Sequence, residues 1–216
     1  MGYGFRVEAW GESACFSRPE LKVERVSYEV ITPSAARGIL EAVMWKPAIR
    51  YVIDEIRVCS PIRFDNVRRN EVSFKANDMR PKSSNENRQQ RASMILKDVR
   101  YAIAAHFEMT DKAGPGDNEG KFREMIRRRL ERGQNFHAPY FGTREFPAFV
   151  RYIGDGEAGP EPIKETRSLG VMLYEIDYVA SKRNDGTRAA TEYVPTYFMA
   201  AMTDGIIDLR GAEVMR

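Results

Sequence analysis

The chain has 216 residues, enough for one large domain or for a compact domain with a smaller one beside it. An apolar fraction of 43% and an aromatic fraction of 11% can build a core and exclude a disordered chain. With 34 basic and 31 acidic residues, no apolar run near 18 residues and no signal-peptide pattern, we expect a cytoplasmic protein that contacts no membrane.

The first third of the chain predicts a strand, a helix and a second strand. Residues 3–10 alternate apolar and polar side chains, as a half-buried strand does. Thr32 and Pro33 are typical of a helix N-terminus, and the run that follows repeats apolar residues at helical spacing until Pro47 ends it. Residues 49–58 alternate again and are rich in β-branched side chains, which favours a strand.

Residues 61–96 show no sustained period and are rich in Asn, Ser, Pro and charged residues, so we predict a long loop or insertion. The segment holds eight basic residues against four acidic ones, a larger surplus than the net charge of +3 for the whole chain. Such a surplus favours a polyanion as partner, while a solvated loop is the alternative.

The rest of the chain predicts a second strand–helix–strand unit. Residues 98–109 and 144–153 read as strands, and residues 119–132 as a helix that ends at Gly133. The order β-α-β, insertion, β-α-β predicts an α+β fold, a ferredoxin-like (RRM-like) domain over residues 1–153 that contains the basic insertion 61–96.

The C-terminal segment predicts a small antiparallel β domain over residues 154–216. Residues 171–178 and 193–202 read as two strands of a long hairpin with a polar tip between them. Asp204-Gly205 is a turn signal, and residues 206–209 form a last short apolar run.

Few residues suggest metal or redox chemistry. Cys15 and Cys59 lack the short spacing of a zinc or redox site, and no group of carboxylates and histidines has metal-ligand spacing. We therefore predict no metal site and no cofactor. Two histidines, His106 and His137, are candidates for acid–base work, with a hydrogen-bonded strand histidine and a solvated loop histidine as the respective alternatives.

Several strings in the chain resemble the subtype I-C (Dvulg-type) form of CRISPR-associated protein five, a member of the RAMP superfamily. They include TPSAARGILEAVMWKPAIR (32–50), PIRFDNVRRNEVS (61–73), LKDVRYAIAAHFE (96–108), DNEGKF (117–122) and FGTREFPA (141–148). The likeness extends from about residue 5 to about residue 205. Its ordered motifs make it a specific resemblance.

The resemblance implies a metal-independent endoribonuclease that cuts CRISPR repeat transcripts. The ribose 2′-OH attacks the adjacent phosphate, which leaves a 2′,3′-cyclic phosphate, and the protein stays on the 5′ handle of the guide RNA. The implied partners are the repeat RNA, the mature guide RNA, and the backbone and large subunits of the type I-C surveillance complex. Double-stranded DNA is a further candidate partner.

The resemblance also implies a catalytic triad of Tyr, Lys and His, and this chain departs from it. The lysine position holds Lys121, but the tyrosine position holds Met44 and the histidine position holds Phe122. Neither Met nor Phe can transfer a proton. A non-catalytic RNA-binding subunit of the complex therefore stays open as an alternative, beside a non-specific duplex nucleic-acid binder.

Basic residues in these motifs are the candidates for RNA contacts. Beside Lys121 we predict Arg37, Lys46, Arg63, Arg68, Arg69, Arg88 and Arg91. Arg37 precedes position 44 by two helical turns and so shares its face of the helix.

Overall fold

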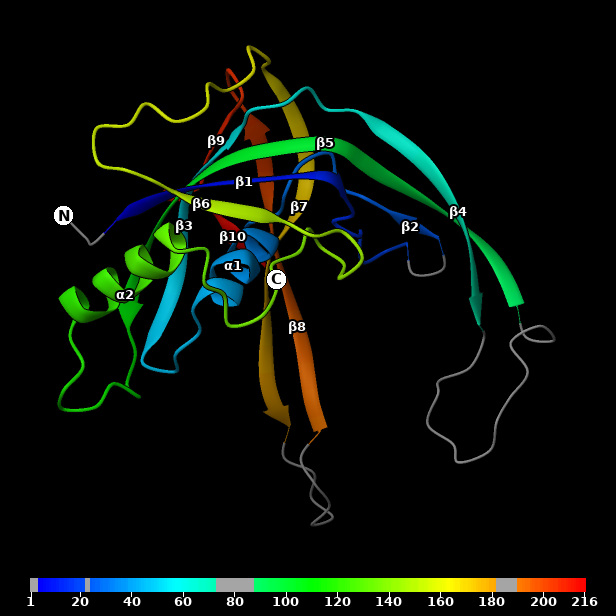
Figure 1. Ribbon diagram of the computed structural model, residues 1–216. Coiled ribbons are helices and arrows are strands. Elements are labelled where there is room, and N and C mark those ends of the chain that lie inside the picture. Colours follow the sequence, from blue (N-terminus) through cyan, green and yellow to red (C-terminus); the bar gives the residue numbers. More distant parts are fainter. Residues whose placement is uncertain (1–3, 22–23, 73–87, 182–189) are drawn as a thin grey trace.

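The computed structural model describes residues 4–21, 24–72, 88–181 and 190–216. The chain folds into a mixed α+β structure with two sheets in which nearly all strand pairs are antiparallel (Figure 1). No helix within those ranges is both long and apolar enough to cross a membrane.

The first sheet is ordered β6-β1-β5-β3-β9 and carries most of the fold. Its strands are β1 (Phe5–Ala14), β3 (Ile49–Val58), β5 (Arg88–Met109), β6 (Phe149–Ile153) and β9 (Ile206–Asp208). The short strand β2 (Arg25–Val26) and the strand β4 (Phe64–Val72) also pair with β5. The predicted strand at 49–58 is confirmed, and those at 3–10 and 98–109 are confirmed within the longer strands β1 and β5, with residue 3 outside the described residues. The strand predicted at 144–153 is shorter, because residues 144–148 belong to a loop.

Helices α1 (Pro33–Val43) and α2 (Glu119–Glu131) cover one face of this sheet. The side chains of Thr32 and Asn118 accept the capping hydrogen bonds at their N-termini, as the sequence predicts for the first of them. The Tyr51 hydroxyl donates to the Met44 carbonyl at the end of α1 (2.8 Å), and Phe122 of α2 packs on Phe107 with ring centroids 6.4 Å apart. Since Tyr51 and Phe107 are cross-strand neighbours, both helices lie on the same face, and no helix of the described residues covers the opposite face.

The prediction of a long loop over residues 61–96 is wrong. Strand β4 and the first ten residues of β5 form a hairpin arm that extends from the sheet, with Arg69 opposite Arg91 and Arg68 opposite Ala92 (Figure 1). The more covered face of β4 carries Arg69 and Glu71 beside Val67, so the arm lacks apolar alternation and its sequence gives no strand signal. Residues 73–87 of the predicted insertion lie outside the described residues.

The second sheet is ordered β10-β8-β7 and packs beside α1. It consists of β7 (Arg167–Ser181), β8 (Ala190–Met202) and β10 (Val214–Met215), so the predicted hairpin is confirmed and is longer than expected. Strand β9, although it follows β8 in the chain, pairs with β3 of the first sheet, with Ile207 opposite Ile56. Residues 206–208 thus share a sheet with the N-terminal strands.

Candidate functional site

The two positions that depart from the family triad lie in the hydrophobic core. Met44 is the C-cap residue of α1 and Phe122 is in the first turn of α2, and their exposed fractions are 1% and 2%. Burial raises the pKa of the neighbouring Tyr51 hydroxyl, which already donates to the Met44 carbonyl. None of these three side chains has access to a ligand in the solvent.

Lys121 lies on the surface beside that core, where the capped N-terminus of α2 positions it. Its Nζ contacts Asp117 Oδ1 at 2.8 Å and the Gly116 carbonyl at 3.5 Å, and its side chain is 47% exposed. The hydrogen bond from Lys121, and after it that from the Gly114 N–H, holds the pKa of the Asp117 carboxyl below its ordinary value. Exposed Lys46 is close enough to lower that pKa further, so two lysines flank one carboxylate.

The loop after α2 folds back onto the C-terminal end of α1. The backbone N–H groups of Phe136 and His137 donate to the Ala42 carbonyl at 2.8 and 3.1 Å, and the Arg129 guanidinium donates to the Val43 carbonyl at 2.8 Å. These donors satisfy carbonyls that the last turn of a helix leaves open. They also fix the loop, and hence His137, at this end of α1.

His137 is exposed and its ring is held in one orientation. Its Nδ1 lies 3.1 Å from the Ala138 carbonyl, and its ring stacks on Tyr140 with centroids 6.1 Å apart at 26°. A carbonyl can only accept, so Nδ1 carries the proton, and Nε2 of the neutral ring keeps its lone pair toward the solvent. That tautomer is suited to a general base.

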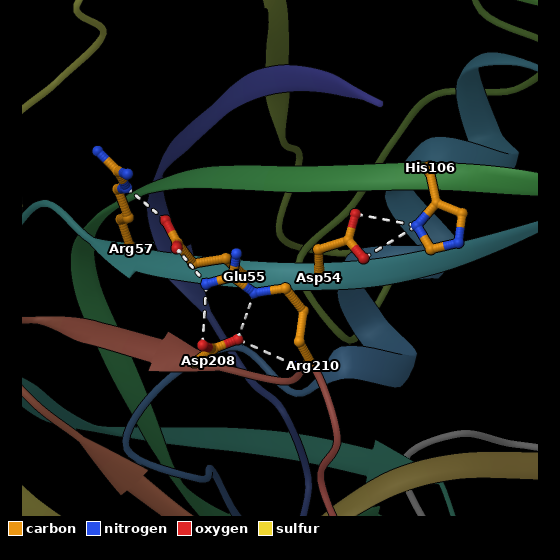
Figure 2. Close-up of polar contacts among 6 residues, drawn as sticks. All are labelled: Asp54, Glu55, Arg57, His106, Asp208 and Arg210. Atoms are coloured by element: carbon orange, nitrogen blue, oxygen red, sulfur yellow. Dashed lines mark hydrogen bonds and ion pairs between the residues drawn. The ribbon is translucent and has the colours of Figure 1, made fainter. Parts of the chain in front are cut away.

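His106 lies elsewhere, on the face of the sheet without helices. Its Nδ1 contacts both oxygens of Asp54 on β3, at 2.9 and 3.0 Å, as Figure 2 shows. Next to this pair, Arg57, Glu55, Arg210 and Asp208 form a surface network that ties β3 to the residues after β9. The structure therefore places the two candidate histidines on opposite faces of the sheet.

Arg37 forms ion pairs with carboxylates of the protein itself. Its Nη1 contacts Glu175 Oε2 on β7 at 2.5 Å, and its Nε lies 3.4 Å from Glu41. Burial raises the pKa of the Glu175 carboxyl, and Arg37 counteracts that rise. Arg37 thus compensates a buried charge between α1 and the second sheet, and its role as an RNA contact stays a prediction.

The remaining predicted cations lie on the hairpin arm and at its root, on two different faces. Arg68 is exposed, and Arg88, also exposed, shares its face of the arm. Arg69 points the other way, forms an ion pair with Glu145 and lies 5.2 Å from the Phe146 ring centre. That ion pair raises the pKa of Arg69 and holds the pKa of the Glu145 carboxyl below its usual value.

Two further arginines of this group have carboxylates beside them. Arg91 lies 3.6 Å from Glu71, and Arg63, at the root of the arm, contacts Asp98 at 3.1 Å. The arm therefore combines the solvent-exposed Arg68 with arginines that bind carboxylates of the protein, a distinction that sequence alone did not make. Within the described part of the chain, no three His, Cys, Asp or Glu side chains gather as a metal site would require.

Two exposed aromatic residues near the end of α1 were not predicted. Trp45 is 52% exposed and Phe136 is 65% exposed. Trp45 directly precedes the candidate Lys46, and Phe136 directly precedes the candidate His137. The sequence signal was their position two residues before Pro47 and in a loop after Gly133, which is too weak to identify a site.

Comparisons with known proteins agree on one family. A family model described as "CRISPR-associated protein (Cas_Cas5)" matches residues 4–210. A "CRISPR pre-crRNA endoribonuclease Cas5d" from Mannheimia succiniciproducens is 45% identical, over 97% of this chain and 96% of that protein. A protein of the same name from Thermus thermophilus is 40% identical, over 94% of this chain and 90% of its own length.

Solved structures support the same fold. A protein described as "Crystal Structure of CRISPR-associated Protein" has a TM-score of 0.67 at 21% identity, and covers 99% of this chain and 96% of its own. A functionally uncharacterized protein from Streptococcus mutans, SMU1763c, has a TM-score of 0.69 at 21% identity, with 99% and 97% covered.

Proposed function

Because this chain belongs to the Cas5 family of CRISPR-associated proteins, in its subtype I-C form, we propose that it is an endoribonuclease that cuts precursor CRISPR RNA. The observation that carries the proposal is 45% identity, over nearly its full length, to a relative named for that activity. The fold is consistent with it. The order β6-β1-β5-β3, antiparallel throughout, with α1 and α2 on one face, supports the ferredoxin-like arrangement.

We place the cleavage at the C-terminal end of α1. His137 is bonded to Ala42 at this end, Lys46 follows the helix and acts on Asp117, which binds Lys121, and the family positions Met44 and Phe122 are buried. In this proposal His137 Nε2 takes the 2′-proton and the two lysines neutralise the phosphate as the 2′-oxygen attacks it. The Lys121 ammonium donates a proton to the leaving 5′-oxygen. These groups supply a base, an acid and positive charge, which the reaction needs, and a metal ion is not required.

The test is incubation with the cognate repeat RNA in EDTA, followed by analysis of the product ends. We expect cleavage in the presence of the chelator, with a 2′,3′-cyclic phosphate and a 5′-hydroxyl. A matched RNA with a 2′-deoxy substitution at the cut nucleotide should stay intact. A strict requirement for Mg²⁺, or cleavage of the deoxy substrate, would contradict the proposed chemistry.

A second candidate function is an RNA-binding subunit without catalysis. The burial of Met44 and Phe122 favours it, because two of the three family positions cannot transfer protons. Repeat RNA that binds and is not cut in the same assay would establish this alternative. In either case the partners we propose are the repeat RNA, the 5′ handle of the guide and the other type I-C subunits, in the cytoplasm where those transcripts are made.

Arg68 and Arg69 of the hairpin arm should contribute differently to RNA binding, and a salt titration can measure the difference. Each phosphate contact to single-stranded RNA contributes about −0.7 to the slope of log affinity against log salt. We expect Arg68→Ala to flatten that slope by about 0.7, because Arg68 faces the solvent. Arg69→Ala is the matched control on the opposite face of the arm, and its slope should stay that of the unmodified protein, because Arg69 binds Glu145. An equal effect of both changes would mean that the Arg69–Glu145 pair opens on binding.

A further inference from the structure

A cleft of about 670 Å³ lies on the face of the first sheet that carries no helix, away from the proposed cleavage site. Strands β1, β5 and β6 form its floor, and its lining includes Glu8, Trp10, Arg100, Phe149 and Arg151. None of these residues takes part in the proposed cleavage, and no sequence motif pointed to them.

Two aromatic rings form one wall of the cleft. Trp10 and Phe149 are direct cross-strand partners on β1 and β6, and their rings stack with centroids 5.8 Å apart at 24°. Trp10 is 36% exposed and Phe149 is 57% exposed. Stacked rings that strands hold in place, with apolar faces left in water, are a surface on which another flat ring can stack.

Charged side chains of both signs line the cleft: the carboxylates of Glu8, Glu12 and Asp98, and the guanidinium groups of Arg100 and Arg151. Glu8 is 1% exposed and lies between two guanidinium groups, with Arg100 Nε at 2.5 Å and Arg151 Nε at 2.6 Å. Arg151 also contacts Glu157 at 2.7 Å. The arginine side chains are 49% and 41% exposed, so the buried carboxylate orients two planar cations that still face the solvent. Such planes stack on bases and donate hydrogen bonds to base or phosphate acceptors.

The cleft also adjoins the root of the basic hairpin arm. Asp98 lines the cleft and contacts Arg63, the residue just before β4, at 3.1 Å. A polyanion that contacts the exposed Arg68 on the arm and continues toward the sheet therefore reaches the edge of the cleft beside Asp98. This continuity favours a nucleic acid over a peptide as the occupant of the cleft.

We propose that the cleft is a second RNA contact, which binds an unpaired nucleobase stacked on the Trp10–Phe149 wall. The inference rests on the proposed function, since it assumes that the chain binds RNA. The cleft would bind a base whose neighbouring phosphates contact the hairpin arm. It lies away from the residues proposed to cleave the RNA.

The fluorescence of Trp10 tests the proposal directly. The chain has two tryptophans, so Trp45→Phe leaves Trp10 as the reporter. A single-stranded oligoadenylate of about 12 nucleotides, within the range that such surfaces bind, should quench its emission. Binding of the oligonucleotide with unchanged Trp10 emission would overturn the proposal and leave the aromatic wall to a protein partner.

Substitutions provide the second measurement. Phe149→Leu keeps an apolar side chain and removes the ring, and should weaken oligonucleotide affinity about 5- to 150-fold. Phe149→Tyr keeps the ring and should keep the affinity. Tyr193→Leu, at a residue that is 64% exposed on the other sheet, is the control and should change nothing. Equal affinities of the Leu and Tyr variants would refute the stacking role.

The two proposals fail in different ways. If the proposed function is wrong, the unmodified protein does not cut repeat RNA, whether or not it binds that RNA. If only the cleft proposal is wrong, the unmodified protein cuts repeat RNA in EDTA, while Phe149→Leu binds as tightly as the parent chain.

Discussion

His137→Ala should reduce the single-turnover rate of RNA cleavage by about 10²- to 10⁴-fold, the contribution of a positioned acid–base group. The ring has one accessible nitrogen, because Nδ1 donates to the Ala138 carbonyl and the stack on Tyr140 fixes the plane. RNA affinity should change little, because the lysines remain. Rapid-quench measurements with excess protein separate the rate from the affinity.

The other histidine is the informative comparison. His106 is held by both oxygens of Asp54 on the opposite face of the sheet (Figure 2), so His106→Ala should change the cleavage rate only a few-fold. The reverse result, with a large loss for His106→Ala and none for His137→Ala, would move the chemistry to the Asp54–His106 pair. Such a pair resembles the carboxylate-oriented histidine of many hydrolases, so the comparison has two physically reasonable outcomes.

Arg37→Ala should lower the free energy of unfolding by an amount near the lower end of the roughly 3–5 kcal/mol expected for breaking a buried ion pair. The loss arises because Glu175, 8% exposed, keeps its charge without its partner. Urea denaturation at pH 7 measures it. Arg127→Ala is the matched control, because Arg127 pairs with Glu124 and Glu131 on the surface, where ion pairs contribute little to stability.

The pH dependence of that loss has a defined sign. Burial raises the pKa of Glu175 in the folded protein, so its protonated form is favoured there, and stability falls as pH rises from about 4.5 through the folded pKa. Without Arg37 that pKa rises further. The destabilisation by Arg37→Ala should therefore shrink as the pH is lowered toward 4.5. Arg37→Ala combined with Glu175→Gln should recover much of the loss at pH 7, and no recovery would show that the charge is not its cause.

The elements that bury one apolar face could be predicted from sequence, and the elements that do not could not be predicted. Helix α1 and strand β3 each bury one face, so their apolar residues repeat with a period that identifies the element and nearly its bounds. In the β4–β5 arm the more covered face carries polar residues such as Arg69 and Glu71, so it has no such apolar period. Strand β9 was predicted as a short run, but nothing local to it indicates that its partner is β3, about 150 residues earlier in the chain.

The candidate site was only partly predictable for a related reason. Lys121 and Lys46 could be found because they belong to motifs with fixed spacing. Whether an arginine faces RNA or a carboxylate depends on residues far away in sequence, as Glu175 does for Arg37 and Glu145 for Arg69. Trp10 and Phe149 fit the pattern of ordinary strand residues, and only their pairing across two strands reveals an exposed aromatic wall.

Strand β9 has one more consequence, for the solubility of the protein. It pairs with Glu55–Arg57 at the outer edge of the first sheet, where an uncovered strand could recruit the edge of another molecule. Because β9 is three residues long and is followed by Arg210 bound to Asp208, the edge it presents in turn is short and charged. The C-terminal segment thereby opposes aggregation of this chain by strand pairing between molecules at that edge.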